Sequence, residues 1–282
     1  MLIEHTLFHG TLVEVSDVRC RVRSAHCGAE EYATGHWLVL PRSGAFVKHS
    51  GARTIIADAA HAIFFNAGES YRVSHPAGLA DACTTVVFST TVLREVAVSV
   101  GAREPSADRA FHLTHAMLSP RSMLLHHWLQ RRCSLMPDAR LAIEEDSMTL
   151  LEHVFRDAGH QQQHRSATRD RTARVRRDLV EATRLELLAS PGHARSLAEL
   201  AQAVATSPFH LTRVFRRELG LPVHQYLVRL RLGLALERLM NGDESLSRIA
   251  FDLGFASHSH FSAAFRRVYG ASPTQVARGS RR

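Results

Sequence analysis

The chain has 282 residues, of which 45% are hydrophobic, and this is enough for about two globular domains with cores of their own. The formal net charge is +8, from 35 basic and 27 acidic residues. An apolar run of about 18 residues, as a membrane span would need, does not occur, and the N-terminus lacks the pattern of a secretory signal peptide. The sequence therefore predicts a soluble intracellular protein.

Residues 1–105 contain many short apolar runs bounded by Gly, Pro, Asn, Asp and Ser. Closely spaced runs of this kind predict short strands, and many short strands favour an antiparallel sandwich or a small barrel. The expected strands are 12–15, 20–23, 36–40, 45–49, 53–57, 62–65, 71–74 and 84–88.

A barrel interior lined by aromatic side chains with a few polar groups is a usual site for a small ligand. The candidates for an effector site in this half are Trp37, Phe46, Phe64, Tyr71, Arg72 and His75. The alternative for each of them is an ordinary position in the barrel core, which the sequence favours over a ligand site.

The chain has four cysteines, Cys20, Cys27, Cys83 and Cys133, without a Cys-x-x-Cys pair, as is typical of free thiols in a reducing compartment. Cys20 and Cys27 suggest redox or metal control as a second sensing hypothesis, because on neighbouring strands they would approach the Cα separation of about 7 Å that a disulfide requires. The alternative is inert thiols packed as small apolar groups. The 19 histidines show no spacing typical of metal ligands, so no catalytic centre, cofactor or resident metal is expected.

Apolar positions at helical spacing predict two amphipathic helices between about 120 and 158. Their apolar residues are Leu124, Leu125, Trp128 and Leu129, then Met148, Leu151, Val154 and Phe155. These helices either pack on their own domain or form the interface of a homodimer. Residues 159–171 are polar and lack apolar periodicity, which predicts a linker.

The last third of the chain contains one pattern twice. Leu197, Ala201, Leu211, Phe215, Arg216, Arg217 and Gly220 correspond to Leu246, Ala250, Phe261, Phe265, Arg266, Arg267 and Gly270. The offset between the copies changes from 49 to 50 residues along the pattern. An insertion inside a helix would rotate every later side chain by about 100°, so the extra residue is expected in a turn. Each copy therefore predicts a helix-turn-helix, at about 196–220 and 245–270.

Helix-boundary signals agree with this prediction. Ser196 and Glu199 form a capping-box pattern, Ser207 precedes a proline, and glycines stand at the expected C-caps. Residues 223–240 have apolar side chains on two faces, which predicts a linker helix buried on both sides. Such a helix would couple the two units rigidly. A compact helical bundle without a DNA role is the alternative.

Charge is concentrated at the C-terminal end. Residues 165–282 contain 20 arginines and 10 acidic residues, so the preceding 164 residues hold the remaining 15 basic and 17 acidic residues. A basic C-terminal domain is expected to bind a polyanion, and a near-neutral N-terminal domain is not.

Residues 172–279 resemble the AraC/XylS family of transcriptional regulators, through Ile249-Ala-Phe-Asp-Leu-Gly-Phe255, His260-Phe-Ser-Ala-Ala-Phe-Arg-Arg267 and Gly270-Ala-Ser-Pro273. The resemblance implies an α+β chain: a cupin-like antiparallel jelly roll with following helices in residues 1–158, for sensing and dimerisation, and an all-α DNA-binding domain of seven helices in residues 172–282. The two recognition helices are implied to enter successive major grooves. The His-x-His of the first cupin motif is absent.

The base-reading positions that the resemblance implies are Phe209, Thr212 and Arg213 in the first unit and His258, Ser259, Ser262 and Ala263 in the second. Arg213 is the first candidate for direct readout, because arginine can contact O6 and N7 of guanine together. Many family members carry arginine where this chain has Ala263, so the second helix is expected to read fewer bases. The remaining residues expected at the DNA surface are Ser207, His210, Arg216, Arg217, Arg266 and Arg267, the arginines mainly on phosphates.

The expected function is a sequence-specific, DNA-binding transcriptional regulator of the bacterial cytoplasm and nucleoid, controlled by a small effector in its N-terminal domain. Its expected partners are double-stranded DNA, a second copy of the chain and, for an activator, RNA polymerase. Two alternatives remain: a constitutive or redox-controlled regulator whose N-terminal half only dimerises, and a cupin enzyme with a basic DNA-binding tail.

Overall fold

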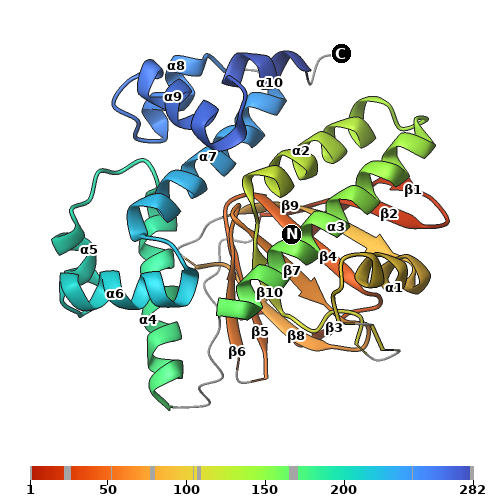
Figure 1. The fold of residues 1–282 in the computed structure, drawn as a ribbon, viewed down its shortest axis with the longest axis horizontal. Helices are drawn as coiled ribbons and strands as arrows, with labels where there is room; N and C mark the ends of the chain where they lie inside the picture. The colour runs from red at the N-terminus through yellow and green to blue at the C-terminus, as the bar shows by residue number, and fades with distance from the viewer. Residues whose placement is uncertain are drawn as a thin grey trace. The chain divides into compact units, whose positions relative to one another are not determined.

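The computed structural model describes residues 2–21, 27–51, 53–76, 80–103, 105–106, 109–164, 171–242 and 244–279. The chain divides into two compact units, one formed by Met1–His160 and the other, Arg282 aside, by Gln161–Arg281. The first unit contains all the described strands, and the second contains only helices (Figure 1). The mixed fold class and the helical C-terminal part therefore agree with the sequence predictions.

The first unit is built on two antiparallel sheets. Its strands are β1 (Leu2–His9), β2 (Val13–Cys20), β3 (Glu31–Tyr32), β4 (Trp37–Ser43), β5 (Phe46–Ser50), β6 (Arg53–Ala57), β7 (His61–Phe65), β8 (Ser70–Ser74), β9 (Asp81–Phe88) and β10 (His115–Met117). One sheet has the order β1-β2-β9-β4-β7-β10 and the other the order β3-β8-β5-β6. In the larger sheet, β2 and β9 pair along their full length, from Val13 opposite Phe88 to Cys20 opposite Asp81.

Side chains from both sheets meet in one hydrophobic cluster, which we call the sandwich core. Its buried members are Ala33, Val39, Phe46, Ile55, Ala57, Ile63, Phe65, Tyr71 and Cys83, with Trp37 and Val73 packed against them. The rings of Phe65 and Tyr71 lie 4.8 Å apart, edge to face, and join the two sheets. Because neighbouring residues of a strand point to opposite faces, Phe64 lies on the other side of β7 from this core.

Helices cover the outer face of the larger sheet. The helices of this unit are α1 (Thr90–Ser99), α2 (Pro120–Leu135) and α3 (Arg140–His164). Phe64 stacks on Phe111, with ring centroids 4.8 Å apart, and Phe111 in turn contacts Phe155 of α3. From α2, His126 Nε2 lies 2.8 Å from the hydroxyl of Thr84 in β9. The two predicted amphipathic helices therefore exist and pack on their own unit.

The predicted helix boundaries differ from the structure at one end. Helix α3 continues to His164, although the polar composition of 159–171 predicted a linker from residue 159. Residues 165–170 of that segment lie outside the described residues, and α4 begins at Arg171. Trp128, expected on the apolar face of α2, has 37% of its surface exposed, while Leu124, Leu125 and Leu129 are buried as predicted.

Seven helices make up the described part of the second unit. They are α4 (Arg171–Ala189), α5 (Leu197–Ala203), α6 (Pro208–Leu219), α7 (Val223–Asn241), α8 (Leu246–Asp252), α9 (His258–Tyr269) and α10 (Pro273–Gly279). Helix α7 runs between the group α4–α6 and the group α8–α10 and contacts α6, α8, α9 and α10 (Figure 1). Residues from both of its predicted apolar faces are buried. They are Tyr226 and Leu230 on one face and Leu232, Leu236, Leu239 and Met240 on the other.

Among the described residues, no helix combines the length and the apolar character needed to cross a membrane.

Candidate nucleic-acid interface

The first helix-turn-helix is formed by α5 and α6. The Ser196 hydroxyl accepts a hydrogen bond from the Glu199 backbone N–H (3.2 Å), and the Glu199 carboxylate accepts one from the Ser196 backbone N–H (2.6 Å), which confirms the capping box. These hydrogen bonds to Ser196 lower the pKa of Glu199. Ser207 caps α6 by accepting from the backbone N–H of His210, and Gly220 ends the helix in the left-handed conformation, with φ of 75°.

The second helix-turn-helix, α8 and α9, repeats this construction. Ser257 caps α9 by accepting from the backbone N–H of His260, and Gly270 ends it with φ of 75°. The turn inside each unit passes through a left-handed residue, Ala205 with φ of 53° and Gly254 with φ of 73°. One residue separates Ala205 from its capping serine, and two residues separate Gly254 from the corresponding one. The insertion between the copies therefore lies in the turn, as predicted.

Helices α6 and α9 bury and expose equivalent positions. Leu211, Val214 and Phe215 are buried in the first, and Phe261, Ala264 and Phe265 are buried at the same places in the second. The residues expected at the DNA surface lie on the other side. Exposed positions are Ser207, Phe209, His210, Arg213, Arg216 and Arg217 in the first helix-turn-helix, and His258, Ser259, Ala263, Arg266 and Arg267 in the second. Thr212 and Ser262 are half-buried at equivalent positions.

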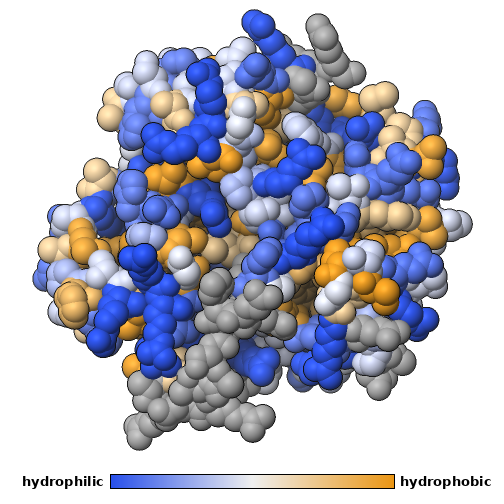
Figure 2. Space-filling model, in the orientation of Figure 1, coloured by the Kyte–Doolittle hydropathy of each residue, from blue (hydrophilic) through white to orange (hydrophobic). Residues whose placement is uncertain are grey.

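The exposed side of each unit is polar and basic, with isolated apolar side chains. Figure 2 shows hydrophilic side chains projecting over α8–α10, with hydrophobic residues between them. Phe209 at the start of α6 is 76% exposed, and Phe251 on α8 is 81% exposed. The two helices differ at one exposed position, as the sequence indicated. Where α6 has the long, charged side chain of Arg213, α9 has only the methyl side chain of Ala263.

A groove of about 330 Å³ runs between α4 and α6. It is lined by Val175, Arg176, His210, Arg213, Val214 and Arg217. Arg176 was not among the residues expected at the DNA surface, and its Nε donates to the Glu218 carboxylate at 3.1 Å. No sequence pattern marks Arg176, because it joins this groove only through the packing of α4 on α6.

Arg231 ties the two helix-turn-helix units together within the second unit. Its Nε donates to the carbonyl of Pro191 (2.6 Å), in the loop before α5, and its Nη1 donates to the carbonyl of Gly254 (2.9 Å), in the turn after α8. Burial lowers the pKa of Arg231. The backbones of Gly192 and Gly254 approach so closely that a Cβ atom on Gly254 would lie 2.1 Å from the Gly192 carbonyl oxygen. The first helix-turn-helix is thus joined to the second at this contact as well as through α7.

The candidate effector residues are only partly brought together. Trp37, Phe46 and Tyr71 belong to the sandwich core, where they fill space between the sheets. The Tyr71 hydroxyl donates to the Glu31 carboxylate at 2.8 Å, and burial together with this carboxylate raises the pKa of Tyr71. The other three lie elsewhere: Phe64 on the opposite face of β7, Arg72 exposed, and His75 buried beside Asp81.

All four cysteines are free thiols in this structure, with Cys27 exposed and Cys20, Cys83 and Cys133 buried. The Cys83 thiol donates to the Asp81 carboxylate at 3.2 Å, and burial, reinforced by Asp81, raises the pKa of Cys83. The prediction that a strand begins at residue 20 is wrong, because Cys20 is the last residue of β2. Residues 22 and 23 of that predicted strand lie outside the described residues.

The sequence similarity between this chain and known proteins lies in the second unit. Residues 200–279 match a family described as a helix-turn-helix domain. Over 80 residues the chain is 40% identical to the probable transcriptional regulator LumQ of Photobacterium leiognathi, covering 28% of this chain and 32% of that protein. It is 38% identical over 97 residues to a putative AraC-like transcription regulator of Streptomyces antibioticus, covering 34% and 32%.

Solved structures that align with most of the chain are also found. ToxT from Vibrio cholerae, with a bound unsaturated fatty acid, is 10% identical with a TM-score of 0.39 over 95% of each chain. The match to the curated relatives spans about a third of their length. Together with the tandem helix-turn-helix geometry, the family match and the curated relatives show that the C-terminal part of the chain is similar to the helix-turn-helix part of AraC-like transcriptional regulators.

Proposed function

We propose that the whole chain is a sequence-specific DNA-binding regulator of transcription in which α6 and α9 read two successive major grooves. The observation that carries this proposal is the matching exposure of α6 and α9, each of which buries one apolar side and presents a polar side ending in two exposed arginines. Exposed arginines at the ends of recognition helices suit phosphate contacts, which hold a helix in register on the duplex. The excess of 20 arginines over 10 acidic residues in 165–282 favours the same partner.

The roles of individual residues differ between the two heads. Arg213 reads a guanine in the first block, with Phe209 and Thr212 beside it, because a guanidinium can contact O6 and N7 together. His258, Ser259, Ser262 and Ala263 read the second block with shorter side chains, so that block depends more on DNA shape and methyl contacts. Arg216, Arg217, Arg266 and Arg267 hold phosphates, and Ser207 and His210 lie at the edge of the first contact.

The N-terminal part, residues 1–158, acts as the sensor and dimerisation domain, residues 159–171 connect it to the DNA-binding domain, and residues 172–282 bind DNA. The two antiparallel sheets of the N-terminal part, packed through one core, support a cupin-like jelly roll. A small effector bound there changes which DNA sites the chain occupies, by binding rather than catalysis; if the chain is an activator, it acts through contact with RNA polymerase.

Selection of bound sequences from random DNA by the full-length chain tests this proposal. We expect two conserved blocks about one helical turn apart, and Arg213→Ala should lose sequence preference in one block at a cost of about 1 to 3 kcal/mol. Arg217→Ala is the matched control on the same helix: it should weaken all sequences alike and reduce the slope of log affinity against log salt by about one. Binding without sequence preference, unchanged by Arg213→Ala, would show that the chain is not a specific regulator.

A further inference from the structure

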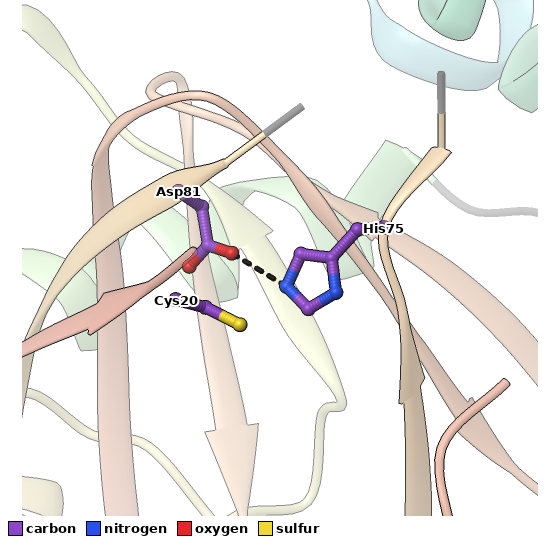
Figure 3. A group of neighbouring side chains, drawn as sticks. All are labelled: Cys20, His75 and Asp81. Atoms are coloured by element: carbon purple, nitrogen blue, oxygen red, sulfur yellow. Dashed lines mark ion pairs between the residues drawn. The ribbon is translucent and has the colours of Figure 1, made fainter. Parts of the chain in front are cut away.

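Three side chains of the types that bind transition metals meet inside the first unit: Cys20, His75 and Asp81 (Figure 3). One ligand atom from each, the thiol sulfur, an imidazole nitrogen and a carboxylate oxygen, lies within 4.8 Å of the other two. All three residues are buried, each with 7% of its surface exposed. Sequence analysis missed Asp81 and placed His75 with the effector candidates.

The fold fixes this arrangement through strand pairing. Cys20 ends β2 and Asp81 begins β9, and the two residues are direct partners across the larger sheet. His75 follows β8 of the smaller sheet, so its ring reaches the cluster from the opposite side of the sandwich. In Figure 3 the sulfur of Cys20, the carboxylate of Asp81 and the imidazole of His75 converge from three separate segments of the chain. The backbone thus holds the three ligand atoms together without any local sequence motif.

The Asp81 carboxylate is held by its contacts with both of its neighbours in the fold, His75 and Cys83. Asp81 Oδ1 lies 2.7 Å from His75 Nε2 and pairs with it, although among the described residues it accepts no hydrogen bond of good geometry. Its other oxygen accepts from the Cys83 thiol, which orients the carboxylate. A buried carboxylate oxygen without a well-aligned hydrogen bond is costly, and a metal ion that replaced this ion pair, with the imidazole and the carboxylate moving apart to bind it, would remove the cost.

We propose that Cys20, His75 and Asp81 bind a divalent transition-metal ion, with zinc as the best fit. Thiolate, imidazole and carboxylate together are a zinc ligand set, and three protein ligands leave a fourth position for water. On binding, Cys20 releases its thiol proton to solvent, so thiolate and carboxylate together balance the two charges of the ion. Cys83 donates to the ligand Asp81 and keeps it in place. The metal joins the ends of β2 and β9 to the end of β8, and so stabilises the sandwich.

Zinc titration of the metal-free, reduced, full-length chain against a chromogenic chelator tests the proposal. We expect one zinc per chain with release of a proton, and a higher thermal midpoint of the loaded protein. Cys20→Ser and Asp81→Asn should weaken zinc binding by at least about 100-fold, more than the loss of an outer-shell partner usually costs. Cys27→Ser, an exposed thiol, and Cys133→Ser, a buried thiol on α2, are matched controls that should bind zinc like the parent chain.

Cobalt gives a second measurement that does not depend on the variants folding. The cobalt-loaded parent chain should show a thiolate-to-cobalt charge-transfer band, and X-ray absorption of the zinc form should show one sulfur with nitrogen and oxygen neighbours. Equal zinc affinity in the parent and a folded Cys20→Ser would overturn the proposal. So would a metal shell without sulfur, or zinc binding that is lost in Cys27→Ser.

Discussion

Lys48 is the chain's single lysine, and it lies in the interior of the β-sandwich. Its Nζ donates to the carbonyl of Phe64 (2.8 Å), pairs with the Glu69 carboxylate (2.8 Å) and lies 3.7 Å from the centre of the Phe65 ring. Burial lowers the pKa of Lys48, and Glu69 opposes this shift only in part. Burial by itself would raise the pKa of Glu69, but hydrogen bonds, first from Lys48, bring it below its ordinary value of 4.5. Each charge therefore depends on the other.

Replacing Lys48 by Met should destabilise the first unit by about 2 kcal/mol, because Glu69 then loses a charged hydrogen-bond partner while it stays largely buried. Adding Glu69→Gln should recover part of this loss, which gives a favourable coupling energy in a double-mutant cycle of urea unfolding. Since the pKa of Glu69 is lowered by folding, its stabilisation is present above pH 4.5 and is lost as the pH falls through the lower folded value. In Lys48→Met the folded-state pKa of Glu69 rises, so the loss of stability that this carboxyl causes on acidification should become smaller. A coupling energy near zero would contradict this account.

At the residue scale, the sequence predicted positions that depend on local periodicity. The exposed side of α6 follows from helical spacing around Leu211 and Phe215, which is why its polar residues lie where they were expected. The candidate effector residues were harder to predict, because Phe64 and Phe65 are adjacent and the local sequence does not indicate which of the two side chains faces the interior. Asp81 was missed because its neighbourhood comes from pairing with Cys20 across sixty residues of chain.

At the scale of elements, caps and turns were predicted well, because serine and glycine mark them directly. Strands and helices without strong local signals were not predicted. One example is β1, an edge strand with five exposed residues, and another is α1, which lies in a segment that was not predicted to be helical. Their formation depends on what they pack against, which single-sequence patterns do not contain. Three of the four left-handed glycines in the described part of the second unit, Gly220, Gly254 and Gly270, show that the same local signal can occur in very different surroundings.

Gly220→Ala and Gly254→Ala should differ in cost. Both glycines have φ above 70°, so a side chain costs about 1 kcal/mol at either position. A Cβ on Gly220 meets nothing within 4 Å, whereas one on Gly254 meets the Gly192 carbonyl at 2.1 Å. Because backbone must move, Gly254→Ala should cost about 2 kcal/mol more in chemical unfolding. Gly270→Ala, which also meets nothing within 4 Å, is the second control and should match Gly220→Ala. Equal losses in all three would mean that the contact between Gly192 and Gly254 is not tight.

At the scale of the DNA-binding unit, its two heads share one framework. Helix α7 contacts α6 of the first head and α8 and α9 of the second, and Arg231 holds the loop before α5 on the turn after α8. Arg238 of α7 adds an ion pair with Asp252 of α8 at 2.6 Å. A head that moved independently would have to break these contacts together. The unit should therefore bind its two DNA blocks at one fixed spacing.

DNA probes with altered spacing test this rigidity in the full-length chain. With the two blocks about one turn, or 34 Å, apart, both heads engage one face of the duplex. Inserting about five base pairs turns one block to the opposite face, and inserting about ten restores the face but doubles the separation, which a rigid unit cannot span. We expect both insertions to reduce affinity to that of a probe with a single intact block, measured by titration at fixed salt. Heads joined flexibly would instead regain most of the affinity with the ten-base-pair insertion, and that recovery would contradict the rigid coupling through α7 and Arg231.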